Sequence, residues 1–287
     1  GKDQSLLWVL ATILARGHIL LEDIPGVGKT TMALAYSKTL GLSYNRVQFT
    51  PDVLPSDVTG YSVPDAQSGQ MRYQSGAVLC NLFLADELNR ATSRTQSALL
   101  EGMEERQVTV DGVTYPMPEP FIVLATQNPV DFVGTYPLPE AQMDRFFLRI
   151  AIGYPSLEEE MAVLERYSAQ VNPMDTLQPV CGGAEIMDLQ EKLGMIYASR
   201  DARNYVASIT AVTRNHPAVQ LGASPRGSIA LLKAAQACAE LSFVLLKNEG
   251  MLPLEKNAAK KTAFIGPFVD NKYLCGSWAI FCDDQDT

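Results

Sequence analysis

The chain has 287 residues, of which 47% are hydrophobic and 19% are charged. This balance is typical of one or two globular domains and excludes a wholly disordered, collagen-like or long coiled-coil chain. Lys and Arg total 23 against 32 Asp and Glu, a net charge of −9, and such an acidic chain repels nucleic-acid phosphates, so we expect no nucleic-acid partner.

The first half of the chain alternates short apolar strands with helices. After a helix at residues 5–16, we expect strands at 18–21, 47–49, 82–85, 121–125 and 147–152. Helices are expected from the glycine-rich turn to about residue 40, and at 92–105 and 139–145. This alternation predicts an α/β fold with a mostly parallel, five-stranded sheet that helices cover on both faces.

Two connecting segments have a different character. Residues 51–74 are polar and rich in Pro, Gly, Ser and Asp, which predicts a long loop or insertion. Residues 108–115 carry Asp111-Gly112 between two apolar runs, which predicts a hairpin with a type I′ turn.

The pattern becomes helical after residue 154, with helices expected at 156–170, 184–194, 199–215 and 225–240. We therefore predict a core domain at residues 1–153 and a small helical domain at 154–240. Residues 241–287 form a third segment, where the sequence pattern is again strand-like and predicts a strand at 262–265.

Targeting and redox features are sparse. The longest apolar stretch, residues 6–15, is shorter than the ~18–20 residues that a membrane span needs. No signal peptide is recognisable, and Gly1 in place of Met indicates a fragment cut at its N-terminus. The five cysteines show no C-x-x-C pair, so we expect neither a zinc site nor a disulfide framework, and a cytoplasmic location.

A glycine-rich turn lies between the first predicted strand and its helix. Glycines let the backbone approach a phosphate, and the N–H groups at a helix N-terminus favour an anion. The turn differs from the G-x-x-x-x-G-K-[ST] phosphate-binding motif only at its first position, which is Asp23. Lys29 would reach the β- and γ-phosphates, and Thr30 would ligate Mg²⁺; the alternative is a surface turn with helix-capping glycines. The predicted nucleotide-binding residues are Asp23, Pro25, Gly26, Val27, Gly28, Lys29, Thr30, Thr31 and Asp86.

Two adjacent carboxylates end the apolar strand at 82–85. Burying either one without a partner is costly, and a bound metal would remove that cost. Asp86 would hold Mg²⁺ and Glu87 would polarise the attacking water. The alternative is a pair of solvated acids at the end of a strand.

Three further residues are candidates for catalysis. Asn128 follows the strand at 121–125, where its amide could orient a water; an ordinary turn before Pro129 is the alternative. Arg145 ends a short helix and carries a permanent charge suited to phosphoryl oxygens, unless it forms a surface ion pair. Arg226 stands at the start of a helix capped by Ser224, where the helix dipole disfavours a positive charge. A nearby anion would explain an arginine there; the alternative is that Arg226 points into water.

These blocks together resemble the MoxR family of AAA+ ATPases over about residues 1–239. The matching text, in order, is HILLEDIPGVGKTT, QFTPDVLPSDVTG, LFLADELNRA, VLATQNP, LPEAQMDRF and LGASPRGSIALL. The resemblance implies an αβα core with a helical lid, Mg²⁺-dependent ATP hydrolysis, and a ring that is usually a hexamer. It makes Asn128 sensor 1, Arg226 sensor 2 and Arg145 an arginine finger.

The resemblance also implies partners. Residues 51–60 look like the helix-2 insertion and 108–115 like the presensor-1 insertion, and both would face the pore of the ring. Relatives act as chaperone-like ATPases that mature client complexes, often with a protein carrying a von Willebrand factor A domain.

The last segment resembles something else. Residues 241–287 contain LSFVLLKNEGMLPL, AFIGPFVDN and GSWA, which are similar to a glycoside hydrolase family 3 β-glucosidase. The resemblance implies a truncated lid with a poorly packed fused tail, and the barrel that carries glycosidase catalysis is absent. Two alternatives to the ATPase therefore stay open. One is a nucleotide-binding module without turnover, because the lid and tail prevent ring assembly; the other is a carbohydrate-active fragment.

Overall fold

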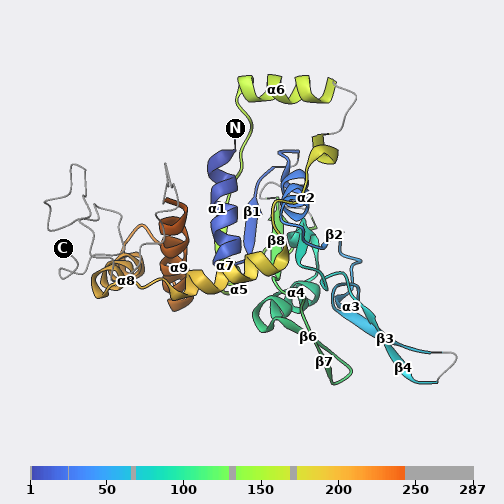
Figure 1. Ribbon diagram of the computed structural model, residues 1–287. Coiled ribbons are helices and arrows are strands. Elements are labelled where there is room, and N and C mark those ends of the chain that lie inside the picture. Colours follow the sequence, from blue (N-terminus) through green and yellow to red (C-terminus); the bar gives the residue numbers. More distant parts are fainter. Residues whose placement is uncertain (1, 25, 66–68, 129–133, 169–172, 243–287) are drawn as a thin grey trace, which may run out of the picture. The chain divides into compact units, whose positions relative to one another are not determined.

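The computed structural model describes residues 2–24, 26–65, 69–128, 134–168 and 173–242 (Figure 1). The chain divides into two compact units, Gly1–Lys192 and Leu193–Thr287. The strand predicted at 262–265 and all but the first two residues of the hydrolase-like segment lie outside the described residues. Within the described ranges, every helix is too short or too polar to cross a bilayer.

A five-stranded sheet forms the centre of the first unit. Its strands are β1 (Ile19–Glu22), β2 (Tyr44–Gln48), β5 (Leu82–Asp86), β8 (Ile122–Gln127) and β9 (Leu148–Ile150). They stand in the order β2-β5-β8-β1-β9, and all four neighbouring pairs are parallel. The predicted α/β fold is therefore confirmed. Parallel pairing also brings the carboxyl ends of all five strands to one edge of the sheet.

Helices cover both faces of this sheet because the central strands are apolar on both sides. On one face, Leu84 of β5 packs in a cluster with residues of α1 (Asp3–Leu14), α2 (Lys29–Thr39) and α7 (Gly183–Met195). On the other face, Phe83 and Ala85 pack in a cluster with residues of α4 (Ser93–Glu105). Residues one position apart along β5 thus enter opposite cores, as the two-residue period of a strand requires.

The loop predicted at residues 51–74 is wrong in part. This stretch contains the short helix α3 (Pro55–Thr59) and an antiparallel pair, β3 (Gly60–Pro64) and β4 (Met71–Ser75). The strands are hard to recognise from sequence because both lie largely at the surface and carry few apolar residues. Their pairing is set by backbone hydrogen bonds rather than by a buried face.

The second hairpin agrees with its prediction. β6 (Gln107–Val110) and β7 (Val113–Pro116) are joined by Asp111 and Gly112, whose φ values are 50° and 79°. Two positive φ values are what a type I′ turn requires. The ring of Tyr115 stacks on Tyr73 of β4 with 3.8 Å between centroids, so this contact joins the two hairpins.

The remaining helices complete the two units. The first unit also holds η1 (Leu88–Arg90), α5 (Glu140–Met143), α6 (Leu157–Ser168) and η2 (Pro173–Thr176). The second unit holds α8 (Arg200–Asn215) and α9 (Pro225–Ser242). Ser199 caps α8 by accepting a hydrogen bond from the N–H of Ala202 at 3.1 Å. The division into domains at residues 1–153 and 154–240 stays a prediction.

Candidate functional site

The glycine-rich turn connects β1 to α2, as predicted. Gly26 and Gly28 have φ values of 88° and 93°, and Gly28 is the N-cap of α2. A Cβ at either position would meet no atom within 4 Å, so it is the positive φ, rather than lack of room, that selects glycine. Pro25 lies outside the described residues. The turn therefore presents the N-terminal N–H groups of an 11-residue helix.

Lys29 is the first residue of α2. Its Nζ donates a hydrogen bond to the backbone oxygen of Asp23 at 2.7 Å. Burial lowers the pKa of the Lys29 ammonium, and the negative charges of Asp23, Asp86 and Glu87 oppose that shift. The phosphate loop after β1 and the acidic end of β5 both lie at the carboxyl edge of the parallel sheet, with β8 between the two strands.

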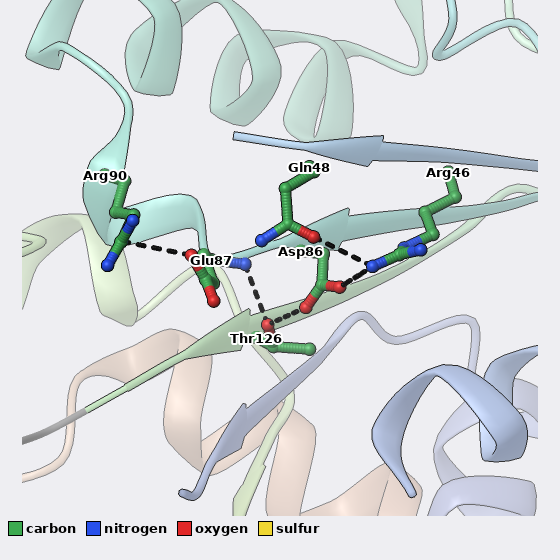
Figure 2. A network of polar contacts seen from close by, with 6 residues as sticks. All are labelled: Arg46, Gln48, Asp86, Glu87, Arg90 and Thr126. Atoms are coloured by element: carbon green, nitrogen blue, oxygen red, sulfur yellow. Dashed lines mark hydrogen bonds and ion pairs between the residues drawn. The ribbon is translucent and has the colours of Figure 1, made fainter. Parts of the chain in front are cut away.

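Asp86 ends β5 with a side chain that is 10% exposed. Figure 2 shows its carboxylate between two donors from neighbouring strands. Oδ2 accepts hydrogen bonds from Nη2 of Arg46 at 2.7 Å and from Nε at 3.2 Å. Oδ1 accepts one from the Thr126 hydroxyl at 2.7 Å. Arg46 also donates to Gln48 at 2.8 Å, so its guanidinium is held from two sides.

Glu87 follows in a left-handed conformation, with φ 57° and ψ 47°. Its N–H donates to the Thr126 hydroxyl at 2.9 Å, and its carboxylate forms an ion pair with Nε of Arg90 at 3.0 Å (Figure 2). The hydroxyl of Thr126 thus bridges both acidic residues. This backbone conformation is unusual for Glu, and it turns the side chain away from the line of β5.

Asn128 comes directly after β8, between the ends of β5 and β1 in the sheet. Its backbone oxygen accepts a hydrogen bond from Nδ2 of Asn89 at 3.2 Å. The end of β8 therefore contributes Thr126 and Asn128 to the edge that also carries Asp86 and the phosphate loop.

Arg145 lies in the first unit and Arg226 in the second. Nε of Arg145 pairs with the Glu104 carboxylate of α4 at 2.8 Å, as in the surface ion pair that the sequence left open. This pair lines a hollow of about 260 Å³ together with Ser97, Glu101, Glu105 and Gln142. Arg226 is an exposed residue in the first turn of α9, whose Ser224 Oγ accepts from the N–H of Gly227 at 3.1 Å.

Sequence reasoning missed two residues of this site, Arg46 and Thr126. Each lies on a strand that ends at the same edge of the sheet, two residues from the end of β2 and one from the end of β8. A polar side chain near the carboxyl end of an otherwise apolar parallel strand is the signal that could have found Thr126. Nothing comparable marks Arg46, because β2 is an edge strand with polar neighbours.

Comparisons with known proteins identify the family and the fold. Residues 18–148 match the profile of the ATPase family associated with various cellular activities (AAA), and residues 211–242 match the AAA lid domain. A crystal structure of a protein from Cytophaga hutchinsonii superposes with a TM-score of 0.76 at 38% identity, covering 83% of this chain and 75% of that one.

Three curated proteins are similar along most of the chain. The uncharacterized protein YeaC of Bacillus subtilis is 52% identical over 241 residues, which are 84% of this chain and 75% of YeaC. Chaperone MoxR1 of Mycobacterium tuberculosis is 40% identical over 248 residues, 83% of this chain and 65% of MoxR1. Protein MoxR of Paracoccus denitrificans is 31% identical over 284 residues, 90% of this chain and 81% of that protein.

Proposed function

Since the chain belongs to the MoxR family of AAA+ ATPases, we propose that it binds and hydrolyses ATP in a Mg²⁺-dependent reaction. We further propose that hydrolysis drives chaperone-like remodelling or maturation of a client protein complex. The observation that carries the proposal is that the phosphate loop with Lys29 and the acidic pair Asp86 and Glu87 follow strands of one parallel sheet at the same edge. A lysine of a phosphate loop and two carboxylates at a strand end are the parts that phosphoryl transfer needs together.

The phosphate loop would bind the nucleotide. Backbone N–H groups from Gly26 to Thr31 point where the dipole of α2 favours an anion. The Lys29 ammonium would exchange its bond to the Asp23 carbonyl for the β- and γ-phosphate oxygens.

Thr30 and Asp86 would hold Mg²⁺, which supplies charge neutralisation at the phosphoryl oxygens when it is bound. Oxygen donors of this kind, one hydroxyl and one carboxylate completed by phosphates and water, suit that ion. Glu87 would accept the proton of the attacking water, and Asn128 would orient that water from the end of β8. Thr126 holds the backbone of Glu87 in place for this role.

Assembly completes the proposed function. We propose a ring, a hexamer as in related AAA+ proteins, in which Arg145 reaches the γ-phosphate of a neighbouring subunit and Arg226 acts as sensor 2. The hairpins β3–β4 and β6–β7, joined by the stack of Tyr73 on Tyr115, would face the pore and engage the client. A protein with a von Willebrand factor A domain is the proposed partner, and the cytoplasm the proposed location.

The test is nucleotide binding by the full chain. Titration with a fluorescent ATP analogue in the presence of Mg²⁺ should give saturable binding, and Lys29→Ala should weaken it by about 100-fold, roughly 3 kcal/mol. Lys38→Ala on the same helix is the matched control and should bind like the parent chain. Equal affinity in Lys29→Ala would remove the loop from the nucleotide site.

One observation favours a second candidate, a nucleotide-binding module without turnover. Arg145 is held by Glu104 of its own chain, so a chain that does not assemble would bind ATP but lack the finger at the γ-phosphate. Sedimentation with and without ATP separates the two candidates. A larger species with ATP, accompanied by phosphate release, supports the ATPase, whereas tight binding by a monomer supports the binding module.

A further inference from the structure

Asp23 stands where the phosphate-binding motif has its first glycine. Its side chain is buried, with 7% of the residue exposed. The carboxylate accepts three backbone hydrogen bonds: Oδ1 from the N–H of Ile24 at 3.0 Å, and Oδ2 from the N–H groups of Ile152 and Gly153, both at 2.6 Å. A charged acceptor with short bonds to two consecutive amides holds them strongly.

The segment that Asp23 holds lies between β9 and α6. Nζ of Lys2 donates to the backbone oxygens of Ile152, Gly153 and Tyr154, at 2.9, 3.0 and 2.9 Å. Side chains from outside the segment therefore bind its N–H groups and its carbonyls. Gly153 has a φ of 71°, so the chain bends here before it continues to the C-terminal helices.

The same residue is bound to the phosphate loop through its backbone. The carbonyl of Asp23 accepts from Nζ of Lys29 at 2.7 Å, and its N–H donates to Gln127 of β8 at 3.2 Å. When the Lys29 ammonium donates to a bound phosphate, the Asp23 carbonyl loses its hydrogen bond from Lys29. Because the Asp23 carboxylate is hydrogen-bonded to Ile152 and Gly153, any displacement of Asp23 would also move the backbone at this bend.

Phosphate binding does not explain why position 23 carries a carboxylate. A negative charge beside a polyphosphate weakens binding by repulsion, and a glycine would avoid that cost. A glycine would also leave the buried N–H of Ile152 without its acceptor. The side chain is therefore better matched to the Ile152–Tyr154 segment than to the nucleotide.

We propose that Asp23 is a positioning residue that links the phosphate loop to the segment 152–154, so that nucleotide binding is transmitted to the chain entering α6. The inference rests on the proposed function only in taking nucleotide as its input. It assigns to the first position of the loop a role in coupling rather than in affinity.

Hydrogen exchange of the full chain, with and without a non-hydrolysable ATP analogue and Mg²⁺, tests the link. In the parent chain the analogue should change exchange several-fold in peptides covering residues 150–155. Asp23→Gly, which completes the phosphate-binding motif, should lose that change at an analogue concentration that saturates the variant. Asp52→Asn, at an exposed aspartate, is the control and should keep it.

Each outcome bears on the proposal. A nucleotide-dependent change at 150–155 that persists in Asp23→Gly overturns it, as does a parent chain that binds the analogue without that change. Loss of binding in a folded Asp23→Gly also overturns it, because Asp23 would then belong to the binding site. If Asp23→Gly fails to fold, Asp23→Ala decides by the same criterion, since it also removes the acceptor of the Ile152 and Gly153 N–H groups. If the parent chain binds no analogue, the proposed function is wrong, and Asp23 then has no nucleotide binding to transmit.

Discussion

The carboxyl ends of β1 and β5 both carry a buried aspartate, but the two carboxylates are neutralised in different ways. Asp23, just after β1, is bound by backbone N–H groups of Ile24, Ile152 and Gly153. Asp86, at the end of β5, is bound by two side chains, Arg46 and Thr126. Backbone donors cannot leave without moving the chain, whereas side-chain donors can rotate away.

This difference suits the two regions to different tasks. A carboxylate that fixes backbone segments is a structural link, and one with side-chain partners can share its oxygens with a metal or its waters. Strand β8 lies between the two regions and contacts both, through Gln127 to Asp23 and through Thr126 to Asp86.

Glu87→Gln should have the largest effect, since an amide cannot take a proton from the attacking water. Turnover should fall by about 10²–10⁴-fold, while nucleotide affinity stays within a few-fold of the parent. Phosphate release measured beside analogue binding separates the two quantities. Glu191→Gln on the exposed face of α7 is the control. Unchanged turnover in Glu87→Gln would remove the general base from the β5 region.

Acid should destabilise the sheet that carries the two regions, because it protonates His18, the residue directly before β1. Its Nδ1 accepts from the N–H of Val123 of β8 at 3.0 Å. Burial lowers the pKa of His18 from 6.5 to about 4; the hydrogen bond to Met103 opposes this and the Arg106 charge adds to it. Between those two pH values the unfolded chain binds more protons. The free energy of unfolding should therefore fall as the pH falls from 6.5 to 4, by up to about 3 kcal/mol.

Urea unfolding measured across that pH range checks this expectation. His18→Asn should flatten the pH dependence, because the variant has no imidazole to protonate. His216→Asn, at the other histidine of the chain, should leave it unchanged. A pH dependence that is the same in His18→Asn and in the parent would show that His18 does not control it.

Thr126→Val should uncouple the two acids at the end of β5. The valine keeps the shape but leaves the Glu87 N–H and one Asp86 oxygen without their partner, at a cost of about 1–3 kcal/mol in the free energy of unfolding. Turnover should fall more than nucleotide affinity, because the position of Glu87 is lost. Thr126→Ser keeps the hydroxyl and should restore both; failure of the serine variant to do so would argue against the bridge.

Arg46→Gln should have the smallest effect, and it should favour Mg²⁺-dependent nucleotide binding where the other variants impair function or stability. The guanidinium and Mg²⁺ are both attracted to Asp86, so loss of the fixed charge should lower the Mg²⁺ concentration for half-maximal nucleotide binding, by about 3–10-fold. Arg46→Lys keeps a charge and should lie between the parent and Arg46→Gln. A higher Mg²⁺ requirement in Arg46→Gln would mean that Arg46 positions Asp86 for the metal instead of competing with it.

The sequence by itself predicted most of the central architecture. Apolar strands that end on polar residues, glycines before a lysine, and a helix after them follow from local rules of burial, positive φ and capping. The Asp111-Gly112 turn was predictable for the same reason, because two left-handed residues in a row select a type I′ turn. The hairpin of β3 and β4 was not, since its strands are held by backbone pairing at a polar surface.

Only the tertiary structure decided which groups share a charge or a hydrogen bond. Lys29 and Asp86 are 57 residues apart, and Asp23 and Ile152 are 129 apart; parallel strand order brings each pair to one edge of the sheet. The partners of Asp86 and Asp23 come from strands and segments distant in the chain. Local sequence pattern encodes where a strand ends, but the neighbours of that end depend on which strands pair.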